Sequence, residues 1–264
     1  MDLQLQHKTA VVTGSTAGIG LAIASLLASE GANVVVNGRS DKSVTEAVER
    51  IQKTGAKGEV RGVAADLSKC EGVEHFLKEV PETEILVNNL GIFEPKPFEK
   101  ITDEDWMRFF ETNVMSGVRL SRAYLPKMKE RNWGRIVFIS SESGLQIPAE
   151  MIHYGMTKTA EIAIARGLAE TCAGTGVTVN AVLPGPTASE GVKDFVESLA
   201  KENNQSRDEF EKEFFKTARP TSLLKRFAKP EEVAPIVAFV CSPLASATNG
   251  AALRVDGGVV KSPF

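Results

Sequence analysis

The chain has 264 residues, of which 42% are hydrophobic and 25% are charged, and its formal net charge is -3. This length fits one large α/β domain or two small ones. The mild charge, with no block of basic residues, excludes the electrostatic footprint of a nucleic-acid-binding protein. No run of about 20 apolar residues predicts a membrane span. Three scattered cysteines, three scattered histidines and the lack of an apolar leader at the N-terminus predict a cytoplasmic protein without disulfides or a metal site.

Short β-branched runs alternate with helical patterns along the whole chain. Strands are expected at 8–13, 33–37, 59–65, 84–88, 135–140, 177–183 and 251–255. Helices are expected at 18–30, 41–54, 68–79, 102–131, 152–172 and 230–241. This alternation is typical of a parallel sheet covered on both faces. It predicts an α/β fold of the Rossmann type, a doubly wound parallel sheet of about seven strands, in a single domain spanning 1–264.

A glycine-rich turn joins the first expected strand to the first expected helix. Its glycines are Gly14, Gly18 and Gly20, which have the spacing G-x-x-x-G-x-G instead of the standard dinucleotide fingerprint G-x-G-x-x-G. Glycines let the backbone approach a pyrophosphate, and the N–H groups and dipole of a helix N-terminus attract an anion. The turn therefore indicates a dinucleotide site, with a purely structural glycine turn as the alternative.

Ser68 and Glu71 have the spacing of a capping box at the start of the third expected helix. Asp66, which follows the third strand, is then not needed as the cap. Its carboxylate could accept a hydrogen bond from a ligand such as an adenine amino group, with a helix cap as the alternative.

A tyrosine and a lysine stand four residues apart in the helix expected at 152–172. Tyr154 and Lys158 share a helix face, and Ser141 ends the fifth strand thirteen residues before the tyrosine. A nearby ammonium favours the phenolate and is expected to lower the pKa of the phenol. A serine hydroxyl can hold a substrate oxygen, with Ser140 as the alternative to Ser141. The set predicts proton transfer at a carbonyl or alcohol oxygen, and an ordinary helix with an exposed lysine is the alternative.

In this order, the motifs resemble the short-chain dehydrogenase/reductase family in its compact single-domain form. The resemblance covers nearly the whole chain and rests on Thr13 to Gly20, Asp66, Asn88 to Gly91, Asn113, Ser141, Tyr154, Lys158, Pro184 to Gly185 and Val255 to Gly258. It implies hydride transfer between NADP(H) and a ketone or secondary alcohol, without a metal. It also implies that Ser141 orients the carbonyl and Tyr154 donates the proton. Lys158 would bind the nicotinamide ribose, and Asn113 would anchor a water of the proton relay.

The resemblance further implies a set of residues that hold the cofactor. They are Gly14, Ser15, Thr16, Gly18, Ile19, Gly20, Arg39, Ser40, Asp66, Leu67, Asn89, Gly91, Tyr154, Lys158, Pro184, Gly185, Thr187 and Ser189. Leu90 replaces the alanine that is usual in the family, which changes one wall of the pocket.

The end of the second strand bears on the choice of cofactor. An acidic residue there would bond the adenosine ribose and repel a 2′-phosphate, and none is present at Asn37 or Gly38. Arg39, aided by Ser40, can pair with that phosphate. This favours NADP, with NAD as the alternative.

Residues 186–229 interrupt the alternation with a charged insertion that carries Phe195, Phe210, Phe214 and Phe215. We expect a helical pair that covers the substrate pocket, with a solvated excursion or an oligomer contact as the alternative. The residues expected to line the pocket suggest a moderately apolar ketone. They are Ile92, Phe93, Leu145, Ile147, Met151 and Phe195.

Within the family, a 3-oxoacyl-thioester reductase of fatty-acid synthesis is the main alternative function. A non-catalytic nucleotide sensor and a methyltransferase on a similar sheet are the alternatives from other classes. The broad apolar faces of 102–131 and 152–172 predict a homo-oligomer, and similar proteins suggest a tetramer.

Overall fold

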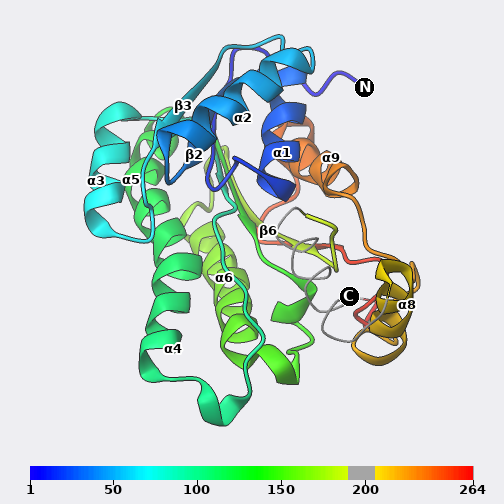
Figure 1. Ribbon diagram of the computed structural model, residues 1–264. Coiled ribbons are helices and arrows are strands. Elements are labelled where there is room, and N and C mark those ends of the chain that lie inside the picture. Colours follow the sequence, from blue (N-terminus) through cyan, green and yellow to red (C-terminus); the bar gives the residue numbers. More distant parts are fainter. Residues whose placement is uncertain (190–205, 264) are drawn as a thin grey trace.

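The fold is built on a seven-stranded parallel sheet with the strand order β3-β2-β1-β4-β5-β6-β7 (Figure 1). The strands are β1 (Thr9–Val12), β2 (Asn33–Gly38), β3 (Val60–Ala64), β4 (Ile85–Asn88), β5 (Gly134–Ile139), β6 (Val177–Pro184) and β7 (Ala252–Val255). This computed structural model describes residues 1–189 and 206–263. The expected Rossmann-type α/β fold is confirmed.

Helices cover both faces of the sheet. They are α1 (Gly18–Ser29), α2 (Asp41–Lys53), α3 (Cys70–Glu79), α4 (Asp103–Phe109), α5 (Ser116–Glu130), α6 (Ile152–Thr171), α8 (Arg207–Thr217) and α9 (Pro230–Cys241). One buried cluster joins α1, α2 and α9 to the sheet, and a second joins α3, α5 and α6 to the opposite face (Figure 1).

The strand sequences show why two cores form. Val12 and Val36 belong to the cluster on the α1 face, whereas Val11 and Val35 belong to the cluster on the opposite face. Successive side chains of a strand point to opposite faces, so a strand buried on both sides must be apolar at nearly every position. This accounts for the unbroken β-branched runs. Because β1, β4 and β5 run parallel, their carboxyl ends lie at one edge of the sheet, where open α/β sheets bind ligands.

The expected helix at 102–131 is interrupted. α4 ends at Phe109, a π-helical turn spans Phe110–Met115, and α5 begins at Ser116. Asn113 lies in the π turn. Such turns are rare inside helices and are frequent at functional sites. A periodic sequence pattern does not reveal one inserted residue, which is why the sequence predicted a continuous helix.

The capping box expected at Ser68 and Glu71 is wrong. α3 begins at Cys70 after Lys69, and no side chain among the described residues caps it. The Ser68 hydroxyl instead donates to the Asp66 carboxylate at 2.7 Å, because the chain turns at this point before the helix starts.

The insertion at 186–229 is described in part, since Phe195 and the rest of residues 190–205 lie outside the described residues. In the described part, α8 carries Phe210, Phe214 and Phe215, and the Phe214 and Phe227 rings stack with centroids 5.1 Å apart. No helix within the described ranges combines the length and apolarity that a membrane span needs.

Candidate active site

The glycine turn forms a tight cradle between β1 and α1. Gly14 and Gly18 have φ of +58° and +55°, a region that L side chains rarely adopt. A Cβ atom on Gly20 would lie 2.4 Å from the Asn89 amide nitrogen and 2.5 Å from the Gly14 carbonyl oxygen. The Asn89 amide donates to the carbonyls of Thr13 and Gly14 at 2.9 and 3.0 Å and so fixes the turn against the end of β4. All three glycines are therefore required by the shape of the turn.

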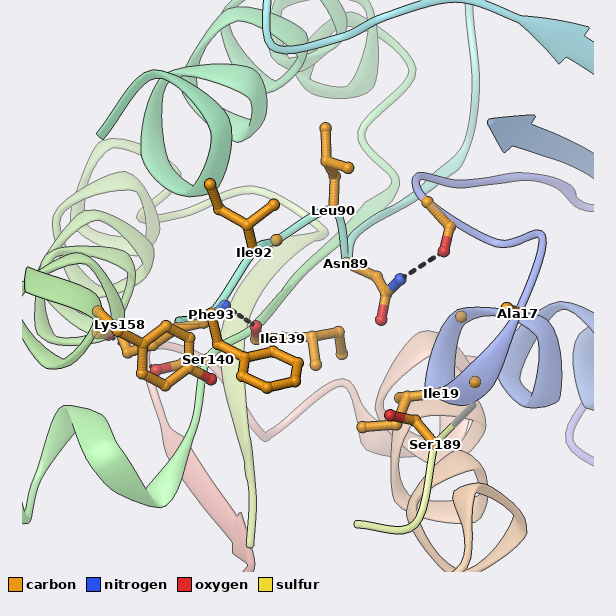
Figure 2. A pocket seen from close by; sticks show the side chains of 15 residues that line it. Ala17, Ile19, Asn89, Leu90, Ile92, Phe93, Ile139, Ser140, Lys158 and Ser189 are labelled. Atoms are coloured by element: carbon orange, nitrogen blue, oxygen red, sulfur yellow. Dashed lines mark hydrogen bonds between the residues drawn. The ribbon is translucent and has the colours of Figure 1, made fainter. Parts of the chain in front are cut away.

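The N-terminus of α1 has no anionic or side-chain partner within the described residues. Its N-cap is Ala17, whose side chain accepts no hydrogen bond, and its first turn contains no acidic residue. The free N–H groups and the positive end of the helix dipole thus favour an external anion. Ser189 lies over this end, since a Cβ atom on Gly18 would be 2.9 Å from the Ser189 Cβ (Figure 2). The cradle fits a pyrophosphate.

A cavity of about 250 Å³ extends from this cradle to Tyr154 and Lys158. Figure 2 shows Ala17, Ile19 and Ser189 at one end and Ser140 and Lys158 at the other. The cofactor residues expected from the sequence that line it are Gly14, Gly18, Ile19, Gly20, Asn89, Gly91, Tyr154, Lys158 and Ser189. Leu90, the departure from the family pattern, also lines it.

The two serines at the end of β5 have different partners. The Ser140 hydroxyl borders the cavity, but it donates to the Lys158 backbone carbonyl at 2.8 Å. The Ser141 hydroxyl accepts from the Ser143 N–H at 3.1 Å, and it lowers the pKa of the Tyr154 phenol. Ser140 therefore fastens β5 to α6, and Ser141 is the serine that acts on the pKa of the phenol.

Lys158 is buried and paired. It is 4% exposed, and its ammonium donates to the Ile139 carbonyl at 2.9 Å. It also donates to both carboxylate oxygens of Glu161 at 3.1 Å. The Lys158 nitrogen lies 5.7 Å from the centroid of the Tyr154 ring. Glu161 was not foreseen from the sequence, although its spacing from Lys158 and Tyr154 places all three on one helix face.

The pKa of Tyr154 corrects one expectation. Burial raises the pKa of the phenol above its ordinary value, and this outweighs the lowering by Lys158 and by the Ser141 hydrogen bond. The carboxylates of Glu161 and Glu142 raise the pKa further. The sequence predicted a lowered value because it considered Lys158 without the burial and without Glu161.

Asn113 connects the π turn to the site. Its amide oxygen accepts from the Ile92 N–H at 2.8 Å, and its amide nitrogen donates to the Ile92 carbonyl and to the Thr157 hydroxyl at 3.0 Å. A Cβ atom on Gly91 would lie 3.4 Å from the Lys158 nitrogen and 3.6 Å from the Asn113 amide oxygen. Asn113, Gly91 and Lys158 are therefore neighbours, although Asn113 does not itself line the cavity.

The side chains at the carboxyl end of β2 divide into buried and exposed groups. Asn37 is 1% exposed, and its amide contacts Gly14, Val63 and Ala65, so it holds three strand ends together. Arg39 is exposed beyond it, and the Ser40 hydroxyl caps α2 by accepting from the Ser43 N–H at 3.3 Å. The structural role of Asn37 was missed because its position in a strand gave no sign of these partners.

The remaining expected cofactor residues do not line the cavity. Ser15 is fully buried, and its hydroxyl donates to the Val12 carbonyl at 2.6 Å and its N–H to the Asn37 carbonyl at 2.9 Å, so it holds the turn in place. The Asp66 carboxylate accepts from Ser68, and the Thr187 hydroxyl donates to the Gly185 carbonyl at 2.9 Å. The others lie outside the lining of the cavity, namely Thr16, Arg39, Ser40, Leu67, Pro184 and Gly185.

Comparison with known proteins gives matches over most of the chain. The family model for short chain dehydrogenase matches residues 8–200. The uncharacterized oxidoreductase YvaG of Bacillus subtilis is 50% identical over 264 residues, and the alignment covers 100% of both proteins. The 3-oxoacyl-[acyl-carrier-protein] reductase FabG of Aquifex aeolicus is 36% identical in an alignment of 264 positions, which covers 98% of this chain and 100% of FabG.

A solved structure is similar over nearly its full length. The crystal structure of L-sorbose reductase from Gluconobacter frateurii, complexed with NADPH and L-sorbose, superposes with a TM-score of 0.93 at 32% identity. The superposition covers 99% of this chain and 100% of that one.

Proposed function

The chain belongs to the short-chain dehydrogenase family and is an NAD(P)-dependent oxidoreductase that acts on CH–OH groups or their carbonyl products; on this premise, we propose that it reduces a ketone with NADPH by a Ser-Tyr-Lys mechanism. The observation that carries the proposal is that Tyr154 and Lys158 line one end of the cavity, with Ser141 acting on the phenol. The Lys158 ammonium lies 5.7 Å from the centroid of the Tyr154 ring, and the cavity that ends at this pair begins at the uncapped N-terminus of α1.

In this proposal the cofactor is held by groups of known position. The backbone of the glycine turn and the N-terminus of α1 bind the pyrophosphate, and Arg39 pairs with the 2′-phosphate of NADP. Lys158 binds the nicotinamide ribose, as the family resemblance implies. The nicotinamide, when bound, supplies the hydride.

The protein side chains provide the proton chemistry. Ser141 holds the carbonyl oxygen by a hydrogen bond, and Tyr154 donates a proton to that oxygen. The raised pKa of Tyr154 keeps the phenol protonated at neutral pH, which is the state that carbonyl reduction requires. Lys158 stabilises the phenolate that remains, and Asn113 supports proton return through a water near Lys158.

A 3-oxoacyl-thioester reductase is the second candidate, since the FabG relative is 36% identical over almost the whole chain. The test is NADPH oxidation with a panel that contains simple ketones, a ketose and a 3-oxoacyl thioester. Turnover of any ketone supports the proposal, and preference for the thioester selects the second candidate. Failure to oxidise NADPH with every member would favour the non-catalytic nucleotide sensor.

We further propose that residues 1–264 form one domain, with a substrate lid around 186–229. The lid proposal is supported by Arg219, which follows α8 and donates to Glu142 beside Ser141 at 2.8 Å. We also propose a cytoplasmic homotetramer. Free Cys70, Cys172 and Cys241 fit a reducing compartment. The outer face of α6 presents exposed Ala163 and Gly167, which would allow a second helix to approach closely.

A further inference from the structure

Glu161 is a buried acid for which the proposed proton transfer has no role. It lies on α6 one turn beyond Lys158 and is 2% exposed. A buried carboxylate is costly unless it is paired and hydrogen-bonded. Its partner is Lys158, whose ammonium reaches both carboxylate oxygens at 3.1 Å. Packing alone would be better served by an apolar side chain at this position, so the carboxylate calls for another explanation.

The pairing changes the charge that Tyr154 experiences. Lys158 directs its ammonium to the Ile139 carbonyl at 2.9 Å and to Glu161, so the cation beside the phenol is matched by a nearby anion. Ile139 and the Asn113 amide supply neutral groups from β5 and the π turn. Glu142, in the short helix Glu142–Gly144 that packs on α6, is the other acid that acts on the phenol.

We propose that Glu161 is a positioning residue that, by pairing with Lys158, holds the Tyr154 phenol in its protonated form and biases the enzyme towards carbonyl reduction over alcohol oxidation. This inference rests on the proposed function, in which Tyr154 is the proton donor. Lys158 lowers the pKa of Tyr154 and Glu161 raises it. Burial raises the pKa of Glu161 itself to about 7. Its negative charge is therefore present at the alkaline pH values where tyrosines titrate.

The size of the effect follows from the helix geometry. Tyr154 and Glu161 are seven residues apart, or about 10 Å along the axis at about 1.5 Å per residue. A unit charge at about that distance, with an effective dielectric constant of about 20, moves a pKa by about one unit. Removal of the Glu161 charge should lower the pKa of Tyr154 by about that amount.

The chain allows a direct measurement, because it contains only two tyrosines. Tyr124 is 1% exposed and donates to the Val80 carbonyl at 2.8 Å, and burial raises its pKa far above the ordinary value. Tyrosinate absorbance on alkaline titration of the full chain can thus come only from Tyr154 and Tyr124. The step that is absent in Tyr154→Phe is the titration of Tyr154.

The experiment compares this titration in wild type, Glu161→Gln, Glu161→Met and Glu161→Asp. In both neutral variants the Tyr154 phenol should titrate about one pH unit lower. In Glu161→Asp, which keeps the charge, it should titrate near the wild-type pH. The second neutral variant serves if the first does not fold. Glu170→Gln is the matched control, since Glu170 is an exposed acid on the same helix. In kinetics, the pH at which NADPH-dependent reduction slows on the alkaline side should fall by the same amount as the Tyr154 titration.

A Tyr154 step that is unchanged in both neutral variants would overturn the role of Glu161. This result is distinct from failure of the proposed function. If Tyr154→Phe keeps near-normal turnover, Tyr154 is not the proton donor, whatever the titration shows. If Tyr154→Phe is inactive and the titration does not move, only the inference about Glu161 fails.

Discussion

At the end of β2 a cation stands where an acidic residue would select NAD. Arg39 is exposed just before α2, and buried Asn37 uses its amide within the fold. Arg39→Asp should replace attraction to a 2′-phosphate with repulsion. A charge-assisted hydrogen bond is worth enough to change binding by about 10–100-fold. Titration with NADPH and NADH should show that loss for NADPH only.

Lys53→Asp is the matched control for Arg39→Asp, because Lys53 is an exposed cation at the far end of α2. It should leave both affinities unchanged. Wild-type protein that already binds NADH more tightly than NADPH would refute the role assigned to Arg39.

His153, next to the catalytic candidate Tyr154, is buried in an unusual way. It is 0% exposed, its ring centroid lies 4.0 Å from that of Phe109, and neither ring nitrogen has a hydrogen-bond partner among the described residues. Burial lowers the pKa of the imidazole below its ordinary value of 6.5. The folded protein therefore holds His153 in its neutral form, whereas the unfolded chain protonates it below about pH 6.5.

The sign of the pH dependence follows from this difference. Below pH 6.5 the unfolded state binds more protons at His153, so stability is lost as the pH falls from there through the lowered folded-state pKa. His153→Leu, of similar volume, should weaken this acid dependence. Denaturant unfolding at a series of pH values checks it, and an equally steep loss of stability in the variant would contradict it.

At the scale of elements, Arg219 ties the segment after α8 to the loop after β5. Its guanidinium donates to Glu142 at 2.8 Å and to Glu150 at 3.2 Å, and the Arg219 and Glu142 side chains are 7% and 4% exposed. Arg219→Met leaves Glu142 buried without this partner. Breaking a buried pair in this way costs about 3–5 kcal/mol. The free energy of unfolding should fall by about that amount.

Arg226→Met is the control for this prediction, because Arg226 pairs with Glu232 in solvent, with side chains 46% and 42% exposed. Exposed pairs contribute little to stability, so this variant should lose much less than Arg219→Met. Equal losses of stability in the two variants would show that the Arg219 contact does not anchor the segment.

The sequence predicted the elements that depend on local pattern. Continuous β-branched runs gave the strands, and the glycine turn followed from its position between a strand and a helix. The π turn at Asn113 and the start of α3 were not predictable, since the first depends on one inserted residue and the second on Ser68 bonding to Asp66 instead of capping the helix. In the site, Tyr154 and Lys158 were predicted to share a helix face. The raised pKa of Tyr154 was not, because burial is a property of the whole fold.

For the whole molecule, the proposed tetramer predicts a measurable mass. α4 exposes Met107 at 57%, and on α6 a Cβ atom at Gly167 would meet no atom within 4 Å. Apolar and small residues on such a face are typical of an interface. Light scattering at micromolar concentration should give four times the chain mass of 28.4 kDa. A value near 28.4 kDa would refute any oligomer.

The proposal that Tyr154 donates the proton is tested most directly by the turnover of Tyr154→Phe with NADPH and the best ketone of the panel. The variant keeps the ring that packs near Phe93 and loses only the hydroxyl. General acid catalysis contributes about 10²–10⁴-fold, so turnover should fall by at least that range while NADPH still binds, as measured by nucleotide fluorescence. Near-normal turnover by the variant would contradict the mechanism.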